Sequence, residues 1–136
     1  MIELEYKSEF LEVSYDSENS LVVARWTANT RHLTIDRYKP EAMALRQIFV
    51  NHHPFAGSLA LTKDFYFILD PETQEWVGQQ FVGYMPPKSA VVVASEFVSQ
   101  LSIEQTLQTM DGTVRYFDNE PEAREWLLSK AKVGEI

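Results

Sequence analysis

Histidines, carboxylates and hydroxyls are the side chains of this chain that could take part in chemistry. The adjacent His52 and His53 can each bind a metal ion through an imidazole nitrogen. A metal site would need further ligands, because adjacent residues on a helix point in different directions. Both histidines stand at the predicted end of a helix, where the helix dipole favours a cation. We therefore expect a structural role for them and no metal.

Glu72 and Glu75 are three residues apart and could form a pair of general acid and base. They follow Asp70 and Pro71, which are typical of a helix start, with Asp70 as the cap and Pro71 at the first helical position. An acidic residue in the first turn also interacts favourably with the helix dipole. Helix capping therefore explains these carboxylates more simply than catalysis does.

Several classes of reaction lack the residues that they require. The chain has no cysteine, which excludes disulfides, thiolate zinc sites and cysteine nucleophiles. Its 5 glycines are isolated from one another, so none forms a phosphate-binding loop. The hydroxyls of Thr34 and Ser102 are expected to cap helices, and neither has a nearby base in the sequence. We therefore predict a protein that is not an enzyme and that uses no cofactor.

Length and charge restrict the partners of this chain. Its 136 residues fit one domain, and 45% of them are hydrophobic, as in an ordinary globular protein. The 20 acidic and 12 basic residues give a formal charge of -8, which would repel nucleic acids and anionic lipids. No apolar run approaches the roughly 20 residues of a membrane span, and the N-terminus lacks the features of a signal peptide. We expect a single cytoplasmic domain over residues 1–136.

Alternating polarity and apolar runs predict five strands. The first two strands are separated by a turn-forming run at 16–20 and make an antiparallel hairpin. The strand at 90–94 has apolar residues on both faces, which is typical of the centre of a sheet. The predicted strands cover residues 8–15, 21–27, 58–63, 90–94 and 113–117.

Capping residues and apolar spacings of three and four predict four helices. The first helix is the longest, and Pro40 either bends it or marks a start near Lys39. Ser102 and Gln105 match a capping box, with a hydroxyl at the cap and an amide three residues later. The caps are Thr34, Asp70, Ser102 and Asp118, and the helix ends lie near His53, Phe81 or Tyr84, Gly112 and Ala131, before a frayed tail at 133–136.

Strand and capped helix alternate twice from Ala90 to Ala131, which predicts an α/β sandwich. The order of the elements, and above all the stretch Thr113 to Leu127, resembles the STAS-like domains, the relatives of the anti-sigma-factor antagonists with small stand-alone bacterial members. The resemblance implies a SpoIIAA-like fold: a mixed sheet of four or five strands, opened by an antiparallel hairpin, with helices mainly on one face. It also implies a regulatory role in protein recognition or ligand sensing. The phosphorylatable Ser or Thr of the family's regulated members has no equivalent in the run that begins at Asp64, so no phosphorylation switch is carried over.

An aromatic run follows the predicted strand that ends near Lys63. In open α/β sheets, ligands bind at the carboxyl ends of the strands, so this run would leave apolar rings partly exposed there. The exit of the strand at 90–94 should lie close by and add a polar margin. The alternative is that residues 65–69 form a strand or fold back over the core. The candidate residues for binding a partner or ligand are Asp64, Phe65, Tyr66, Phe67, Ser95, Glu96 and Phe97.

Three classes of function follow from these residues. The first is a non-enzymatic regulatory module that binds a protein partner, or a second copy of itself as a homodimer, through the exposed rings. The alternative is a carrier or sensor of a small apolar ligand, in which the same rings line a cavity between helices and sheet. A hydrolase or isomerase would require that Asp64 and Glu96 come together with raised pKa values.

Overall fold

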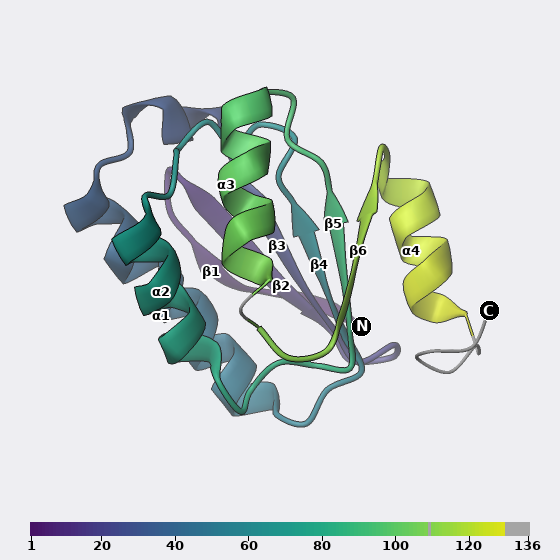
Figure 1. The fold of residues 1–136 in the computed structure, drawn as a ribbon. Helices are drawn as coiled ribbons and strands as arrows, with labels where there is room; N and C mark the ends of the chain where they lie inside the picture. Colours follow the sequence, from purple (N-terminus) through teal and green to yellow (C-terminus); the bar gives the residue numbers. More distant parts are fainter. Residues whose placement is uncertain (109, 130–136) are drawn as a thin grey trace.

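The computed structural model describes residues 1–108 and 110–129. They form one mixed sheet in which six strands follow one another in chain order (Figure 1). The first three strands are antiparallel neighbours, and the pairs from the third strand to the sixth are parallel. The strands are β1 (Ile2–Lys7), β2 (Leu11–Asp16), β3 (Leu21–Trp26), β4 (Gly57–Leu61), β5 (Lys88–Val92) and β6 (Thr113–Phe117).

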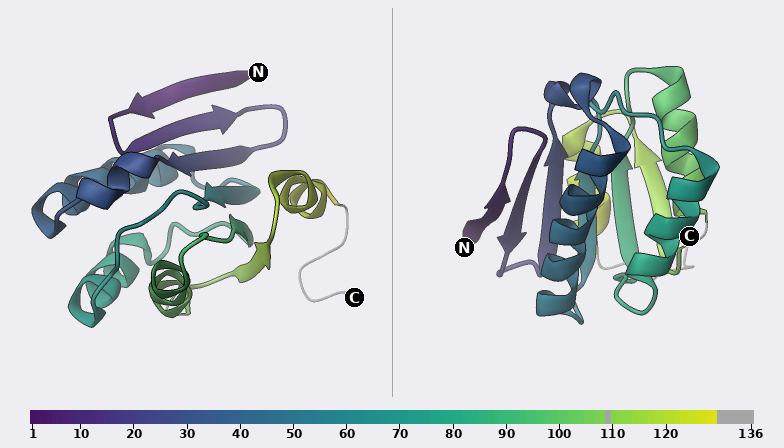
Figure 2. Two further views of the ribbon diagram at one scale, coloured as in Figure 1. Left: turned by 90° about the horizontal axis from the view of Figure 1, so that it is seen from above. Right: turned by 90° about the vertical axis from the view of Figure 1, so that its left-hand side faces the viewer.

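The helices of the described residues cover the sheet unequally, with more of them on one face than on the other (Figure 2). Parallel strands require crossover connections, and three of the helices lie in these connections on the same side. A 3₁₀ turn, η1 (Ala28–His32), precedes the first of them. The helices are α1 (Ile35–His52), α2 (Pro71–Phe81) and α3 (Phe97–Leu107) on one face and α4 (Glu120–Leu128) on the other.

Side-chain alternation divides the interior into two apolar layers. On β3, Val22 and Ala24 face α1 to α3, whereas Leu21 and Val23 belong to the layer under α4. β5 is buried along its whole length, as expected for a parallel strand covered on both faces, but it lies between β4 and the edge strand β6 rather than at the centre of the sheet, where the sequence places it. The predicted α/β class is therefore confirmed, with the main core on the side of the three helices.

The sheet has six strands where the sequence predicts four or five. The additional strand is β1, whose residues are exposed except for the half-buried Tyr6. Charged residues alternate with apolar ones in β1, and the sequence contains no continuous apolar run there. The strand lies at the edge of the sheet, where most of both its faces is exposed to solvent, so it needs no such run. The Asp70 cap is confirmed, since its carboxylate accepts a hydrogen bond from the Thr73 N–H at 2.8 Å. Pro40 lies inside α1, so the start near Lys39 is wrong.

Two predicted helix starts are wrong. The third helix begins at Phe97, and Ser102 lies inside it, where its hydroxyl donates to the carbonyl of Ser99 and accepts from the Leu69 N–H. The last helix is capped by Asn119 rather than by Asp118, because Asn119 Oδ1 accepts from the Glu122 N–H at 3.0 Å. A polar residue near a helix has several possible backbone partners, so the pattern alone misplaces the cap. The predicted tail at 133–136 lies outside the described residues.

Candidate ligand-binding cavity

The aromatic run after β4 folds back over the end of the sheet. Phe65 is only 3% exposed and packs edge-on against Trp26, with ring centroids 5.1 Å apart. Phe67 is half-buried and stacks on Tyr38 at 5.1 Å. The expectation that both rings face solvent is therefore wrong for Phe65, and the alternative of a segment folded over the core is the one observed.

A buried hydroxyl holds this run in place. Thr30, in η1, donates to the carbonyl of Asp64 at 3.0 Å and accepts from the Tyr66 N–H at 2.9 Å. The Tyr66 ring is half-buried and lies under the guanidinium of Arg31, 4.0 Å from its centroid. These contacts between distant parts of the chain turn the run inward, and nothing in its local sequence indicates them.

The exits of β4 and β5 lie side by side, as predicted. The N–H and the hydroxyl of Ser95 both donate to the carbonyl of Lys63, at 3.1 and 3.0 Å. Asp64 is exposed and Glu96 is half-buried, and within the described residues no hydrogen bond or ion pair joins the two carboxylates. Phe97 is 78% exposed at the start of α3. Asp64, Ser95, Glu96 and Phe97 thus lie at the surface where β4 and β5 end, whereas Phe65 belongs to the core and lines the cavity described below.

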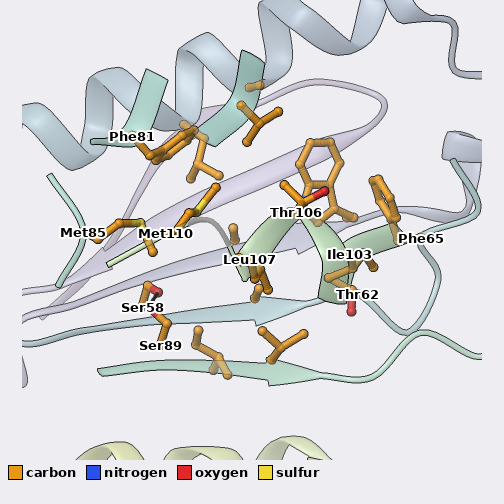
Figure 3. A pocket seen from close by; sticks show the side chains of 18 of the residues that line it. Ser58, Thr62, Phe65, Phe81, Met85, Ser89, Ile103, Thr106, Leu107 and Met110 are labelled. Atoms are coloured by element: carbon orange, nitrogen blue, oxygen red, sulfur yellow. Dashed lines mark hydrogen bonds between the residues drawn. The ribbon is translucent and has the colours of Figure 1, made fainter. Parts of the chain in front are cut away.

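A cavity of about 120 Å³ lies between the sheet and the three helices on its larger face. Figure 3 shows its lining side chains, which come from the strands below and the helices above. Small residues on the strands create the space: Ala24 and Ala60 are register partners on β3 and β4, and Ser58 and Ser89 are partners on β4 and β5. Ala60 is half-buried, although it occupies a strand in the middle of the sheet. Its accessible surface faces the cavity.

The two ends of the cavity differ. Phe65 and Thr62, both buried, lie where β4 ends, and they close the cavity there. Met85, Leu107 and Met110 are half-buried and lie in the chain just before β5 and β6, at the opposite end of these strands. The residues at this end are therefore more accessible than Phe65 and Thr62, and the flexible thioethers of Met85 and Met110 can adapt to a guest.

The interior of the cavity is neutral. Among the described residues that line it, none has a charged side chain. Burial raises the pKa of the Tyr38 hydroxyl well above its usual value, so this group stays protonated. Thr62 donates to the carbonyl of Val92 at 2.5 Å, and Thr106 donates to the carbonyl of Ser102 at 2.7 Å. The other polar groups of the lining are the indole N–H of Trp26 and the hydroxyls of Ser58 and Ser89, and the two serine oxygens are 2.8 Å apart.

His52 has a structural role at the end of α1. Its Nε2 lies 2.8 Å from Glu5 Oε1, and its ring stacks on Tyr15 with centroids 3.6 Å apart. These contacts attach β1 and β2 to the helix. In the described part of the chain, no group of three or more His, Asp or Glu side chains is placed to hold a metal ion.

Comparisons with known proteins do not identify the chain. No family model matches it, and the searches of curated proteins and of solved structures found no match. Within residues 1–108 and 110–129, none of the helices has the length and hydrophobicity needed to cross a membrane.

A cavity between helices and sheet, lined by the aromatic run, is one alternative that the sequence raises, and Phe65 of that run does line the observed cavity. The small strand residues that create the space were not identified, although a signal for them was present. The strands predicted at 58–63 and 90–94 are neighbours inside the sheet, and small residues stand on the same face of them near their starts. Ser58 and Ala60 are two residues apart and therefore share a face, and Ser89, just before the predicted strand at 90–94, is the register partner of Ser58 and faces the same side. Where small residues occupy one face of a sheet, the helices above either pack closely against the strands or leave a cavity. The distance of the helices from the sheet decides between these outcomes, and the sequence does not give that distance.

Proposed function

We propose that this protein binds a small, neutral, apolar molecule in the cavity beneath α1, α2 and α3. The observation that supports the proposal is the apolar space of about 120 Å³ above Ala60, bordered on one side by half-buried methionines. An engineered apolar cavity of about 150 Å³ is known to bind benzene. A guest of roughly one six-membered ring therefore fits this cavity. The protein then acts as a carrier or sensor of such a molecule.

Filling the cavity tests this function. Methylenecyclohexane, a neutral ring of suitable size, is titrated into ¹⁵N-labelled protein and followed by amide chemical shifts. We expect a Kd on the order of 1 mM, with shifts at the cavity residues, since a guest of this size gains only a few kcal/mol. Ala60→Leu should abolish the shifts, because the added side chain occupies the same space. Ala44→Leu, on α1 and outside the lining, is the matched control and should bind normally.

A second candidate function is self-association through the outer face of α3. Phe97, Val98 and Leu101 are exposed on one side of this helix. Glu104 is the one charged residue of α3, so two copies would meet there without strong repulsion despite the acidic chain. A contiguous exposed apolar patch is typical of an interaction surface.

Sedimentation velocity over a range of concentrations tests this second function. The double variant Phe97→Ser with Leu101→Ser should abolish any concentration-dependent increase in sedimentation. Val82→Ser removes an exposed apolar side chain just after α2, outside the α3 patch, and should leave sedimentation unchanged. A chain that stays monomeric at all concentrations, with or without the substitutions, contradicts the proposal.

We also propose that the fold is related to the STAS-like domains and that the protein is cytoplasmic. The relationship is supported by the mixed sheet that opens with antiparallel strands and by three helices on one face. The stretch that carries the resemblance in sequence forms β6 and α4. The absence of cysteine is consistent with a reducing compartment.

A further inference from the structure

Two buried hydroxyls form a pair on the floor of the cavity. Ser58 on β4 and Ser89 on β5 are register partners, and both line the cavity. They are 8% and 4% exposed, and their oxygens are 2.8 Å apart. Ser58 and Ser89 stand near the start of their strands, at the end of the cavity where Met85 and Met110 are found (Figure 3).

The pair has one more hydrogen than its own contact uses. Each hydroxyl carries one hydrogen, and the bond between the two oxygens consumes one of the two. Within the described residues, neither serine donates to any other acceptor. The threonine hydroxyls that line the cavity differ, since Thr62 and Thr106 both donate to main-chain carbonyls. Buried hydroxyl hydrogens without an acceptor are rare in native proteins, and such a group calls for an explanation.

We infer that the ligand carries one neutral hydrogen-bond acceptor, such as a ketone or ester oxygen, which accepts the spare hydrogen of the Ser58 and Ser89 pair. This inference rests on the proposed function and defines the chemical class of the guest. The apolar body of the ligand fills the space above Ala60, and its oxygen points to the floor near the methionines. The pair then fixes the orientation of a guest that would otherwise be free to turn.

The charges around the cavity exclude a carboxylate as this acceptor. No lining residue of the described chain is cationic, and a buried carboxylate without a counter-charge is strongly unfavourable. Lys88 is adjacent to Ser89 in the chain, but successive residues of a strand face opposite sides. Its Nζ lies 3.3 Å from the carbonyl of Trp126, on the α4 side of the sheet. The acceptor is therefore uncharged.

Two probes of the same shape test the inference. Cyclohexanone carries a carbonyl oxygen where methylenecyclohexane has a CH₂ group, so the two rings differ in one acceptor. The double variant Ser58→Ala with Ser89→Ala removes both hydroxyls and leaves no unpaired partner. We expect it to raise the Kd of cyclohexanone by about tenfold, while the Kd of methylenecyclohexane changes by less than about twofold.

Tyr38→Phe and Thr62→Val are the matched controls. Each removes another hydroxyl from the lining, and neither should change the ratio of the two dissociation constants. A second readout needs no variant: the ¹³C carbonyl shift of bound cyclohexanone should resemble its value in an alcohol. This readout keeps the test decisive if the double variant does not fold.

The outcomes separate the two proposals. If methylenecyclohexane binds but the double variant binds cyclohexanone unchanged, the inference is overturned and the proposed function stands. A bound carbonyl shift typical of a hydrocarbon solvent, or a loss of ketone binding in Tyr38→Phe instead, also overturns it. If neither ring binds the unaltered protein, the proposed function itself fails. Cyclohexanecarboxylate bound as its anion more tightly than the ketone contradicts the neutral acceptor.

Discussion

The ring of Phe65 packs edge-on against the indole of Trp26, with an angle of 71° between the planes. Trp26 ends β3 and also stacks on Tyr38 at the start of α1, with centroids 5.9 Å apart. The contact therefore joins the segment after β4 to a strand and to a helix that are distant in sequence. Such aromatic pairs contribute about 0.5–1.5 kcal/mol beyond the burial of their surface. Phe65 closes one end of the cavity and is part of the core.

Phe65→Ala should therefore destabilise the protein. We expect a loss of about 3–5 kcal/mol in the free energy of unfolding, because a buried aromatic ring is replaced by a larger void. Phe97→Ala is the control, and its effect should stay within about 0.5 kcal/mol, since the ring is exposed. Urea unfolding followed by circular dichroism measures both. Equal stability of the two variants would contradict the position of Phe65 in the core.

The same contact explains what sequence reasoning could and could not predict. Helices with strong local signals were found, as at Asp70, because a cap and its first turn lie within a few residues. The burial of Phe65 depends on Thr30 and Trp26, which the fold brings from other parts of the chain. The start of α3 at Phe97 could not be predicted from the local sequence either. The first turns of this helix expose apolar residues, which is atypical of a surface helix, so the apolar pattern does not mark its start.

The two halves of the interior should respond differently to an added side chain. Ala60 borders the cavity, so Ala60→Leu should leave the free energy of unfolding unchanged or raise it by up to about 2 kcal/mol. Ala123 is fully buried between α4 and the sheet, in the layer of Leu59 and Leu127. Ala123→Leu should cost about 1–3 kcal/mol, because the added atoms have no space. Thermal unfolding of both variants measures the contrast, and a strongly destabilised Ala60→Leu would show that the space is not available.

Two glycines with positive φ differ in their surroundings. Gly83 has φ 85° with open space around its Cβ position, whereas a Cβ on Gly112 would lie 2.6 Å from the carbonyl oxygen of Pro86. Gly83→Ala should cost only the left-handed conformation, about 1–2 kcal/mol. Gly112→Ala should cost clearly more, because the loops before β5 and β6 must also separate. Chemical denaturation measures the free energy of unfolding of the two variants. Equal decreases would mean that the loop containing Pro86 can move away from residue 112 without loss of stability.

The carboxylate of Asp16 makes stability depend on pH in the acidic range. Its Oδ2 accepts from the Asn19 side chain at 2.8 Å, and this bond, with those from the Asn19 and Glu18 N–H groups, lowers its pKa. Because the folded pKa lies below the unfolded value of about 3.9, this group stabilises the fold above about pH 4. The stabilisation is lost as the pH falls through the folded pKa. Asp16→Asn should therefore be less stable than the unaltered protein at pH 7, and the difference should shrink steadily as the pH falls below about 4. Urea unfolding of both proteins between neutral and acidic pH measures this difference, and one that stays constant with pH would assign the effect to packing rather than to charge.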